Sequence, residues 1–549
     1  MAALEDAAGH LWADLFLAFS VDTAQGLDGT ARVGSPVVEE NGSGVLIRLP
    51  LESSRWPRKQ VLLSCGDDHL ALSVEVEGRG DLTDCHLLGG FFAGGGRWPS
   101  GFGRSGPGFA SLFNPEPSGT EVRAVPASSG AAIDVLGTAL PGRRHWFLTP
   151  PPFCFGMSRM VPEAGDLPAG PWTMAGLLVR PGEHTFTRFA YDGADDAFAF
   201  RLSYEGQTRI DGPWRSPELC FLFDAPDPYQ GLEQYVALLE MKGLVPGPRT
   251  AARPAWWRRP IFCGWGAQSH LAAAAGGAPQ DYATEESYDA FLHSLAQRGL
   301  QPGSVIIDDK WQSAYGLSRP DPAKWPDLRG WIARRHAAGQ RVLLWWKAWD
   351  PQGLPPRLCV RDHLGNPVSA DPSNPEYEAL LRASIRQMLG GNELDADGLK
   401  IDFTGSTPSG PGLERYGDAW GVELLYRLLS IVADEARRVT PDALLITHTP
   451  NPYFRGQAGM IRLNDLNPEH PVIPQMRHRT RVVRAACPEL LIDTDNWQMP
   501  DKASWRRYLA VQAELGVPSL YYATHVDVTR EPLDDDDYAA IAETWEKAG

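Results

Sequence analysis

The stretch Asp397-Gly-Leu-Lys400-Ile-Asp402-Phe403 decides the fold of this chain. It is a short apolar run that ends at a carboxylate, as a buried strand does at the edge of a parallel sheet. Alternation along a strand points Lys400 and Asp402 to the same side, so a cation and a carboxylate project together. The nearby cation favours an ionised Asp402, which is the form that a nucleophile needs. A purely structural ion pair would look the same, so the neighbouring stretches must decide between the two.

Seven other short apolar runs between residues 260 and 525 also lead into polar residues. Continuous rather than alternating apolar runs are typical of parallel strands that are buried on both faces. Helical patterns separate the runs, for example at 288–296, 328–338, 377–389, 422–438, 505–515 and 538–547. The pattern predicts an α/β fold, a (β/α)8 TIM barrel with its active site at the C-terminal strand ends. The seven runs are Ile261–Trp265, Ser304–Ile307, Arg341–Trp346, Ala443–Thr447, Met460–Leu463, Leu490–Ile492 and Ser519–Tyr522.

The first 225 residues have a different pattern, of short β-like segments between glycine and proline turns. This pattern predicts an N-terminal antiparallel β-sandwich domain. Residues 226–259 are expected to form a helix and a proline-rich linker, and residues 260–549 the catalytic barrel. Gly101–Gly106 fits the dinucleotide pattern G-x-G-x-x-G, but Pro107 follows where a helix should open. We therefore expect a flexible loop of the sandwich there, without a cofactor.

Composition excludes several classes of function. The net charge of −17 argues against a nucleic-acid partner, which requires a basic surface. No apolar run is long enough to span a membrane. The N-terminus lacks the basic region of a secretory signal, and the seven cysteines are dispersed, so we expect a cytoplasmic protein with reduced thiols. No His, Cys and carboxylate cluster has metal-ligand spacing, so we expect no cofactor; a homo-oligomer stays open.

Three motifs carry a resemblance to a known family. Ile306–Gln312 (IIDDKWQ), Lys400–Asp402 (KID) and Arg462–Asp465 (RLND) together resemble the retaining α-galactosidases of glycoside hydrolase family 36, including their raffinose-synthase-like members. The resemblance covers residues 225–549. It implies that Asp402 is the nucleophile and that Asp465, close after an Arg, is the acid/base. It also implies that an oligosaccharide or glycoside is the substrate, and that sugar hydroxyls are held by Asp308 and Asp309.

The chemistry of retaining glycosidases suits these assignments. They need two carboxyls about 5–5.5 Å apart, one to attack the anomeric carbon and one to protonate the leaving oxygen. Lys400 is expected to lower the pKa of Asp402, while a less solvated Asp465 stays protonated. Asp308 and Asp309 could instead cap a helix, and most tryptophans are simply core residues. The further candidates for substrate contact are Trp311, Trp346, Lys347, Lys400, His448, Arg462 and Asp495.

The chain also departs from the family pattern. Phe403-Thr404 stands where Met-Asn is usual, and Thr447-His448-Thr449-Pro450 stands in place of a Ser/Cys-Gly-Gly motif. These changes leave the identity of the sugar open. We predict a retaining α-glycosidase that acts on α-galactosides or close relatives. The alternatives are a transglycosylase with the same residues and a non-catalytic sugar-binding barrel, which would not need two opposed carboxylates.

Overall fold

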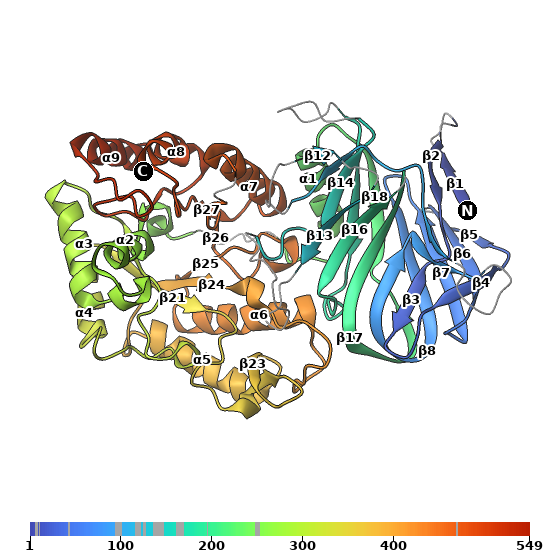
Figure 1. Cartoon of the computed structure of the whole chain (residues 1–549), viewed down its shortest axis with the longest axis horizontal. Coiled ribbons are helices and arrows are strands. Elements are labelled where there is room, and N and C mark those ends of the chain that lie inside the picture. The colour runs from blue at the N-terminus through green and yellow to red at the C-terminus, as the bar shows by residue number, and fades with distance from the viewer. Residues whose placement is uncertain are drawn as a thin grey trace.

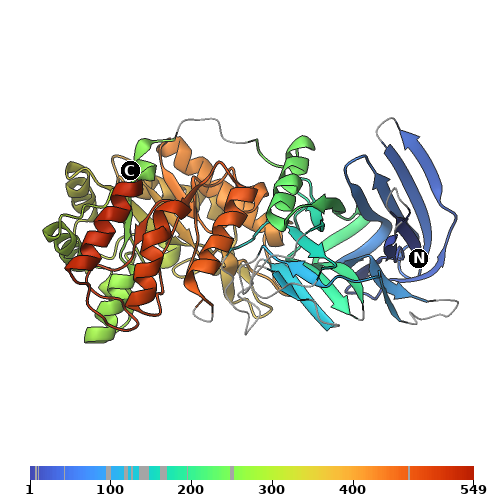
Figure 2. The ribbon, with the colours of Figure 1, turned by 90° about the horizontal axis from the view of Figure 1, so that it is seen from above.

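The computed structural model describes residues 1–5, 9, 11–41, 44–93, 101–115, 122–124, 128–134, 148–160, 170–194, 196–247, 253–467 and 470–548. A β-rich N-terminal body and an α/β barrel lie side by side along the long axis (Figure 1). Helix α1 (Pro228–Met241) follows the last strand of the first body and lies at the junction, as the view from above shows (Figure 2). Asp227 caps α1 by accepting hydrogen bonds from the amides of Tyr229 and Gln230.

The N-terminal body is the predicted sandwich of mainly antiparallel strands. Two long strands, β8 with 18 residues and β17 with 19, pair with each other and join its layers. Among the described strands of this N-terminal body, only the pair β4–β9 is parallel. The strands are β1 (Ala2–Glu5), β2 (Leu11–Leu15), β3 (Ser20–Thr23), β4 (Gly29–Val33), β5 (Val37–Asn41), β6 (Gly44–Ser53), β7 (Arg58–Cys65), β8 (Leu70–Leu87), β9 (Gly89–Phe92), β10 (Phe102–Arg104), β11 (Ser111–Phe113), β12 (Val122–Ala124), β13 (Ser128–Asp134), β14 (Cys154–Ser158), β15 (Trp172–Leu178), β16 (Arg188–Ala194), β17 (Ala197–Arg215) and β18 (Glu218–Ala225).

Two features of the sandwich bear on the predictions. The glycine motif does not form a loop, because β10 pairs antiparallel with β9 and no helix opens from it among the described residues. The core of the sandwich holds a buried ion pair, in which Lys59 Nζ lies 2.6 Å from Asp28 Oδ2 and donates to Thr30 Oγ1 at 3.1 Å. Asp28 also accepts from Ser53 Oγ and the Val21 amide, so this buried pair is well satisfied.

The barrel is an eight-stranded parallel sheet in the order β27-β26-β25-β24-β21-β20-β19-β28. A parallel bridge between Asp493 of β27 and Val517, two residues before β28, connects the two ends of the sheet. All eight predicted strands are present: β19 (Ile261–Cys263), β20 (Ser304–Ile307), β21 (Arg341–Lys347), β24 (Gly398–Asp402), β25 (Leu444–Thr447), β26 (Met460–Arg462), β27 (Leu491–Asp493) and β28 (Ser519–Leu520). A short hairpin of β22 (Cys359–Arg361) and β23 (Pro367–Ala370) follows β21.

Successive side chains along each strand point alternately into the barrel and toward the surrounding helices. Alternate residues such as Ile306, Leu343, Ile446 and Met460 form one small buried cluster inside it. The residues between them, such as Ile461, belong to the larger core shared with the surrounding helices. The interior of the barrel is therefore filled by packed apolar side chains. The polar residues lie at the C-terminal ends of the strands.

Helices cover the outside of the barrel. Six were predicted: α3 (Glu285–Gln297), α4 (Leu328–Ala337), α5 (Pro375–Leu389), α6 (Gly421–Val439), α8 (Lys502–Leu515) and α9 (Asp535–Ala548). Two were not: α2 (Trp265–Ala275), which begins directly after β19, and α7 (Val472–Ala486), whose arginines and β-branched residues obscure its apolar face. None of the described helices is long and apolar enough to cross a membrane.

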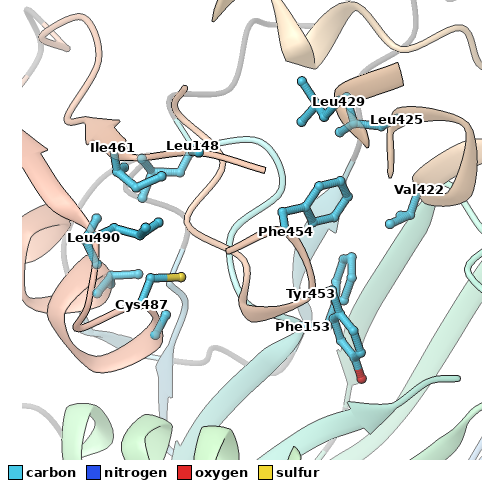
Figure 3. Close-up of a cluster of buried hydrophobic side chains, with 14 of the residues drawn as sticks. Leu148, Phe153, Val422, Leu425, Leu429, Tyr453, Phe454, Ile461, Cys487 and Leu490 are labelled. Carbon is cyan, nitrogen blue, oxygen red and sulfur yellow. The ribbon is translucent and has the colours of Figure 1, made fainter. Parts of the chain in front are cut away.

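The connection between β25 and β26 has no α-helix, although all of its residues are described. The N-terminal domain packs there instead, through Leu148 and Phe153 (Figure 3). Leu148 lies beside Ile461 of β26, and the ring of Phe153 lies 6.1 Å from that of Tyr453. The two domains therefore share one hydrophobic core, and the sandwich covers strands that a helix covers elsewhere in the barrel.

Candidate active site

Asp402 is the last residue of β24 and points into the barrel mouth together with Trp345. Its Oδ1 accepts from Arg462 Nη2 at 3.0 Å and from the Phe403 amide at 2.8 Å. Its Oδ2 accepts from Trp345 Nε1 at 3.1 Å. His448 Nδ1 lies 3.8 Å from Oδ1. Donors therefore hold both carboxylate oxygens, with Trp345 on the adjacent strand β21 and Arg462 on β26, and together they fix the plane of the carboxylate.

Arg462, the last residue of β26, joins three carboxylates. Its Nη1 lies 3.0 Å from Asp465 Oδ1 and 2.8 Å from Asp495 Oδ2, while Nη2 contacts Asp402. The guanidinium is buried. Burial alone would lower the pKa of Arg462, but the charges of Asp402 and Asp495 outweigh it and raise that pKa. The arginine is therefore a permanent cation at the centre of the acidic cluster.

The shared arginine limits how far apart Asp402 and Asp465 can lie. The two terminal nitrogens of a planar guanidinium are about 2.3 Å apart, which places the two bound oxygens within roughly 8 Å of each other. The separation of about 5–5.5 Å that retaining glycosidases use lies inside this bound. The Asp465 side chain is 36 % exposed and that of Asp402 14 %, so the expectation that Asp465 is the less solvated was wrong. Asn464, in a left-handed conformation (φ 66°), precedes Asp465 just after the strand.

Lys400 lies below Asp402 in the barrel and has a different partner. Its Nζ donates to Asp308 Oδ2 at 2.7 Å and lies 3.5 Å from Cys263 Sγ. Burial lowers the pKa of Lys400, but the charge of Asp308 outweighs it and the net shift is upward. The cation in direct contact with Asp402 is therefore Arg462, and Lys400 forms a second ion pair beneath the mouth.

Asp308 and Asp309 follow β20 and do not cap a helix, since the next α-helix, α4, is capped by Asp327. Asp309 Oδ1 accepts from Tyr315 OH at 2.7 Å and Oδ2 from Gln280 Nε2 at 3.1 Å. Burial raises the pKa of Asp309 to about 6, although the bond from Tyr315 opposes the shift. The two adjacent acids therefore have separate partners, Lys400 for one and neutral donors for the other.

The structure places the two predicted tryptophans, Trp311 and Trp346, in the buried core. Trp346 lies in the core between the barrel and its helices, on the opposite face of β21 from Asp402. Trp311 is fully buried and its Nε1 donates to the Trp345 carbonyl at 2.8 Å. Trp345, which was not selected from the sequence, is the indole that contacts Asp402. Lys347 pairs with Asp402 in the sheet, so the side chain two residues earlier, Trp345, points to the same side as Asp402. This register would have selected Trp345.

The remaining predicted residues lie at the same end of the barrel. Lys347 Nζ lies 2.8 Å from Asp350 Oδ2 and 4.3 Å from the ring centre of Tyr315. Asp495 is buried against Arg462. His448 is fully buried, and its Nε2 lies 2.7 Å from Thr404 Oγ1. The structure thus gathers the predicted polar residues beneath and around Asp402, and leaves Trp346 outside.

A pair of aromatic rings lies at the barrel mouth, just after the ends of β19 and β27. The rings of Trp265 and Trp497 meet edge to face at 5.8 Å, and both are partly exposed. Asp527 Oδ2 accepts from Trp497 Nε1 at 2.9 Å and from Gln498 Nε2 at 3.0 Å. Among the described residues, no group of three His, Cys, Asp or Glu is arranged to hold a metal ion. The site is therefore built from carboxylates, two buried cations and aromatic rings.

Comparisons with known proteins give a likeness in structure only. No protein-family model matches the sequence, and no curated protein matches it. An α-galactosidase from Thermus thermophilus in complex with stachyose has a TM-score of 0.54 at 15 % identity, over 93 % of this chain and 99 % of that chain. An α-galactosidase from Lactobacillus brevis has a TM-score of 0.54 at 12 % identity, over 100 % and 74 %.

A family 31 sulfoquinovosidase from E. rectale, in complex with an aza-sugar inhibitor, has a TM-score of 0.59 at 10 % identity, over 97 % of this chain and 78 % of that chain. These alignments span the sandwich and the barrel together, so the likeness extends to the arrangement of both. The chain has a fold like that of the glycoside hydrolase family 36 α-galactosidases.

Proposed function

We propose that this protein is a retaining α-glycoside hydrolase with Asp402 as nucleophile and Asp465 as acid/base. The observation that carries the proposal is that one buried arginine, Arg462, binds both carboxylates at the C-terminal mouth of a barrel. A barrel that only bound sugar would have no need for two ionisable acids joined in this way. The fold shared with α-galactosidases supports an α-galactoside as the first substrate to test.

The environments of the two acids support their roles. Asp402 accepts from Arg462, Trp345 and a backbone amide, which favours an ionised and fixed carboxylate suited to attack. Asp465 has the more exposed side chain, which suits a group that exchanges protons with a leaving group and then with water.

The reaction follows as two displacements. In the first, an Asp402 oxygen bonds to the anomeric carbon while the bond to the leaving oxygen breaks and Asp465 gives that oxygen its proton. In the second, Asp465 takes a proton from water, whose oxygen bonds to the anomeric carbon as the bond to Asp402 breaks. The released sugar keeps its α-configuration, and Asp402 and Asp465 return to their initial protonation states.

Aryl α-glycosides with different sugars test the activity and identify the sugar. Asp402→Ala should lose nearly all turnover, and a fluorosugar inactivator should label Asp402 in the natural protein. Asp465→Ala should fail on poor leaving groups, and azide should rescue its turnover of good ones with an α-glycosyl azide as product. Azide rescue of Asp402→Ala should instead give the β-product.

Asp327→Asn serves as a matched control. It changes a carboxylate that only caps α4, and asparagine caps helices as well as aspartate does, so activity should be retained. Fluorosugar labelling of another carboxylate, or full activity of Asp402→Ala, would refute the proposal. Product analysis with a sugar acceptor present distinguishes hydrolysis from transfer.

A further inference from the structure

We propose that Thr149, a residue of the N-terminal domain, positions Asp402 through Thr404 and His448. We call these three residues the Thr149 relay. The inference concerns how the nucleophile is held, and its kinetic readout rests on the proposed function. It gives the sandwich a part in the chemistry of the barrel.

The two hydrogen bonds within the relay are short and buried. Thr149 Oγ1 lies 2.9 Å from Thr404 Oγ1, although the two residues are 255 positions apart in the chain. Thr404 Oγ1 lies 2.7 Å from His448 Nε2, and His448 Nδ1 lies 3.8 Å from Asp402 Oδ1. Thr404 also follows Phe403, whose amide donates to the same Asp402 oxygen. The relay thus approaches the nucleophile both through a side chain and through the backbone.

The charge of Asp402 sets the direction of these hydrogen bonds. A neutral imidazole carries its proton on one nitrogen, and a proton on Nδ1 of His448 faces the carboxylate, whereas a lone pair there would repel it. Nε2 is then the acceptor, and Thr404 donates to it. The single hydroxyl hydrogen of Thr404 is used in this bond, so its oxygen accepts from Thr149. The hydroxyl of Thr149 therefore begins an ordered chain of hydrogen bonds that ends at His448. The Nδ1 proton of His448 then faces Asp402 Oδ1 at 3.8 Å, an electrostatic contact and not a hydrogen bond.

The segment that carries Thr149 is anchored to the barrel on both sides of the relay. The Thr149 amide donates to the His448 carbonyl at 2.9 Å, and Thr449 Oγ1 donates to the Thr149 carbonyl at 2.7 Å. Asn451 Nδ2 donates to the Pro151 carbonyl at 2.7 Å. Leu148 and Phe153, at the two ends of the segment, are buried in the shared core (Figure 3). Thr149 can therefore hold Thr404 and His448 without itself moving.

Thr149→Val tests the relay, because valine keeps the shape of threonine and removes its hydroxyl. We expect kcat on an aryl α-glycoside to fall about three- to tenfold, the effect of one buried hydrogen bond, with KM unchanged. Thr149→Ser keeps the hydroxyl and should restore kcat to within about twofold of the natural protein. Tyr453→Phe is the matched control, since its hydroxyl accepts from the Val179 amide at 2.9 Å across the same domain interface but outside the relay. This variant should lose stability and keep its kcat.

The ¹⁵N shifts of His448 give a second readout that does not need an active enzyme. We expect a protonated Nδ1 and an unprotonated Nε2 in the natural protein, and a loss of this single form in Thr149→Val. A proton on Nε2 in the natural protein overturns the inference, as does a Thr149→Val protein with natural kcat and an unchanged spectrum. A protein that hydrolyses no glycoside but shows the expected shifts would refute the proposed function and leave the relay standing.

Discussion

Replacing Arg462 with methionine should damage both the stability and the activity of this protein. The guanidinium is buried and holds Asp402, Asp465 and Asp495 at 3.0, 3.0 and 2.8 Å. Methionine fills much of the same space but leaves the carboxylates of Asp402 and Asp495 without their shared cation and removes the hydrogen-bond donor to Asp465. Removing one partner of a buried ion pair costs about 3–5 kcal/mol, because the remaining charge stays uncompensated.

This cost can be converted into a shift of the midpoint of thermal unfolding. A barrel of about 290 residues has an unfolding entropy of roughly 0.6 kcal/mol per kelvin, so Tm of the barrel should fall by about 5–8 °C. Because Arg462 also fixes Asp402 Oδ1, the freed carboxylate should lose its orientation, and kcat/KM should fall by about 100-fold or more.

Calorimetry and aryl-glycoside kinetics on the same samples measure the two effects. Arg455→Met is the control: this buried arginine binds Glu240 and the Pro246 carbonyl away from the mouth, so Tm should fall while kcat/KM stays within about twofold. Adding Asp495→Asn to Arg462→Met removes one uncompensated charge and should recover part of the Tm but none of the activity. An Arg462→Met protein with natural Tm, or a double variant less stable than the single one, would refute this reasoning.

Three further predictions follow from the same geometry. Trp345→Phe removes a donor to an ionised Asp402 and should lower kcat/KM about 10- to 100-fold, whereas Trp346→Phe on the opposite face should lower only Tm. The pKa of Asp309 is raised to about 6, so the stability that it contributes is present below about pH 4 and is lost as pH rises through 6. Relative to Asp309→Asn, the natural protein should lose about 2 kcal/mol of unfolding free energy between pH 4 and 7, and equal pH profiles would contradict this. Lys59→Met leaves a buried carboxylate without its cation and should destabilise the sandwich by about 3–5 kcal/mol in denaturant unfolding; an unchanged midpoint would show that the pair is dispensable.

The architecture of the barrel could be predicted from the sequence because each of its strands is buried on both faces. Continuous apolar runs located all eight strands, and alternation along β24 placed Lys400 and Asp402 on the same, inward side of the strand. Burial on both faces also explains why the sequence pattern led to Trp346 rather than Trp345 as the predicted substrate contact. When both faces of a strand are apolar, hydrophobicity does not tell which face is the interior, so only the sheet register separates the two indoles.

The sequence alone determined that several acids, a lysine and an arginine lie at or near the strand ends. Tertiary structure decided which of them touch: Lys400 binds Asp308, and Arg462 joins Asp402 to Asp465 and Asp495. It also brought Thr149 against Thr404 across the domain interface. Local pattern fixes the strand on which a residue lies and the side to which it points. The partner of a buried charge depends on how the barrel closes and how the sandwich docks, and these bring together residues far apart in the chain.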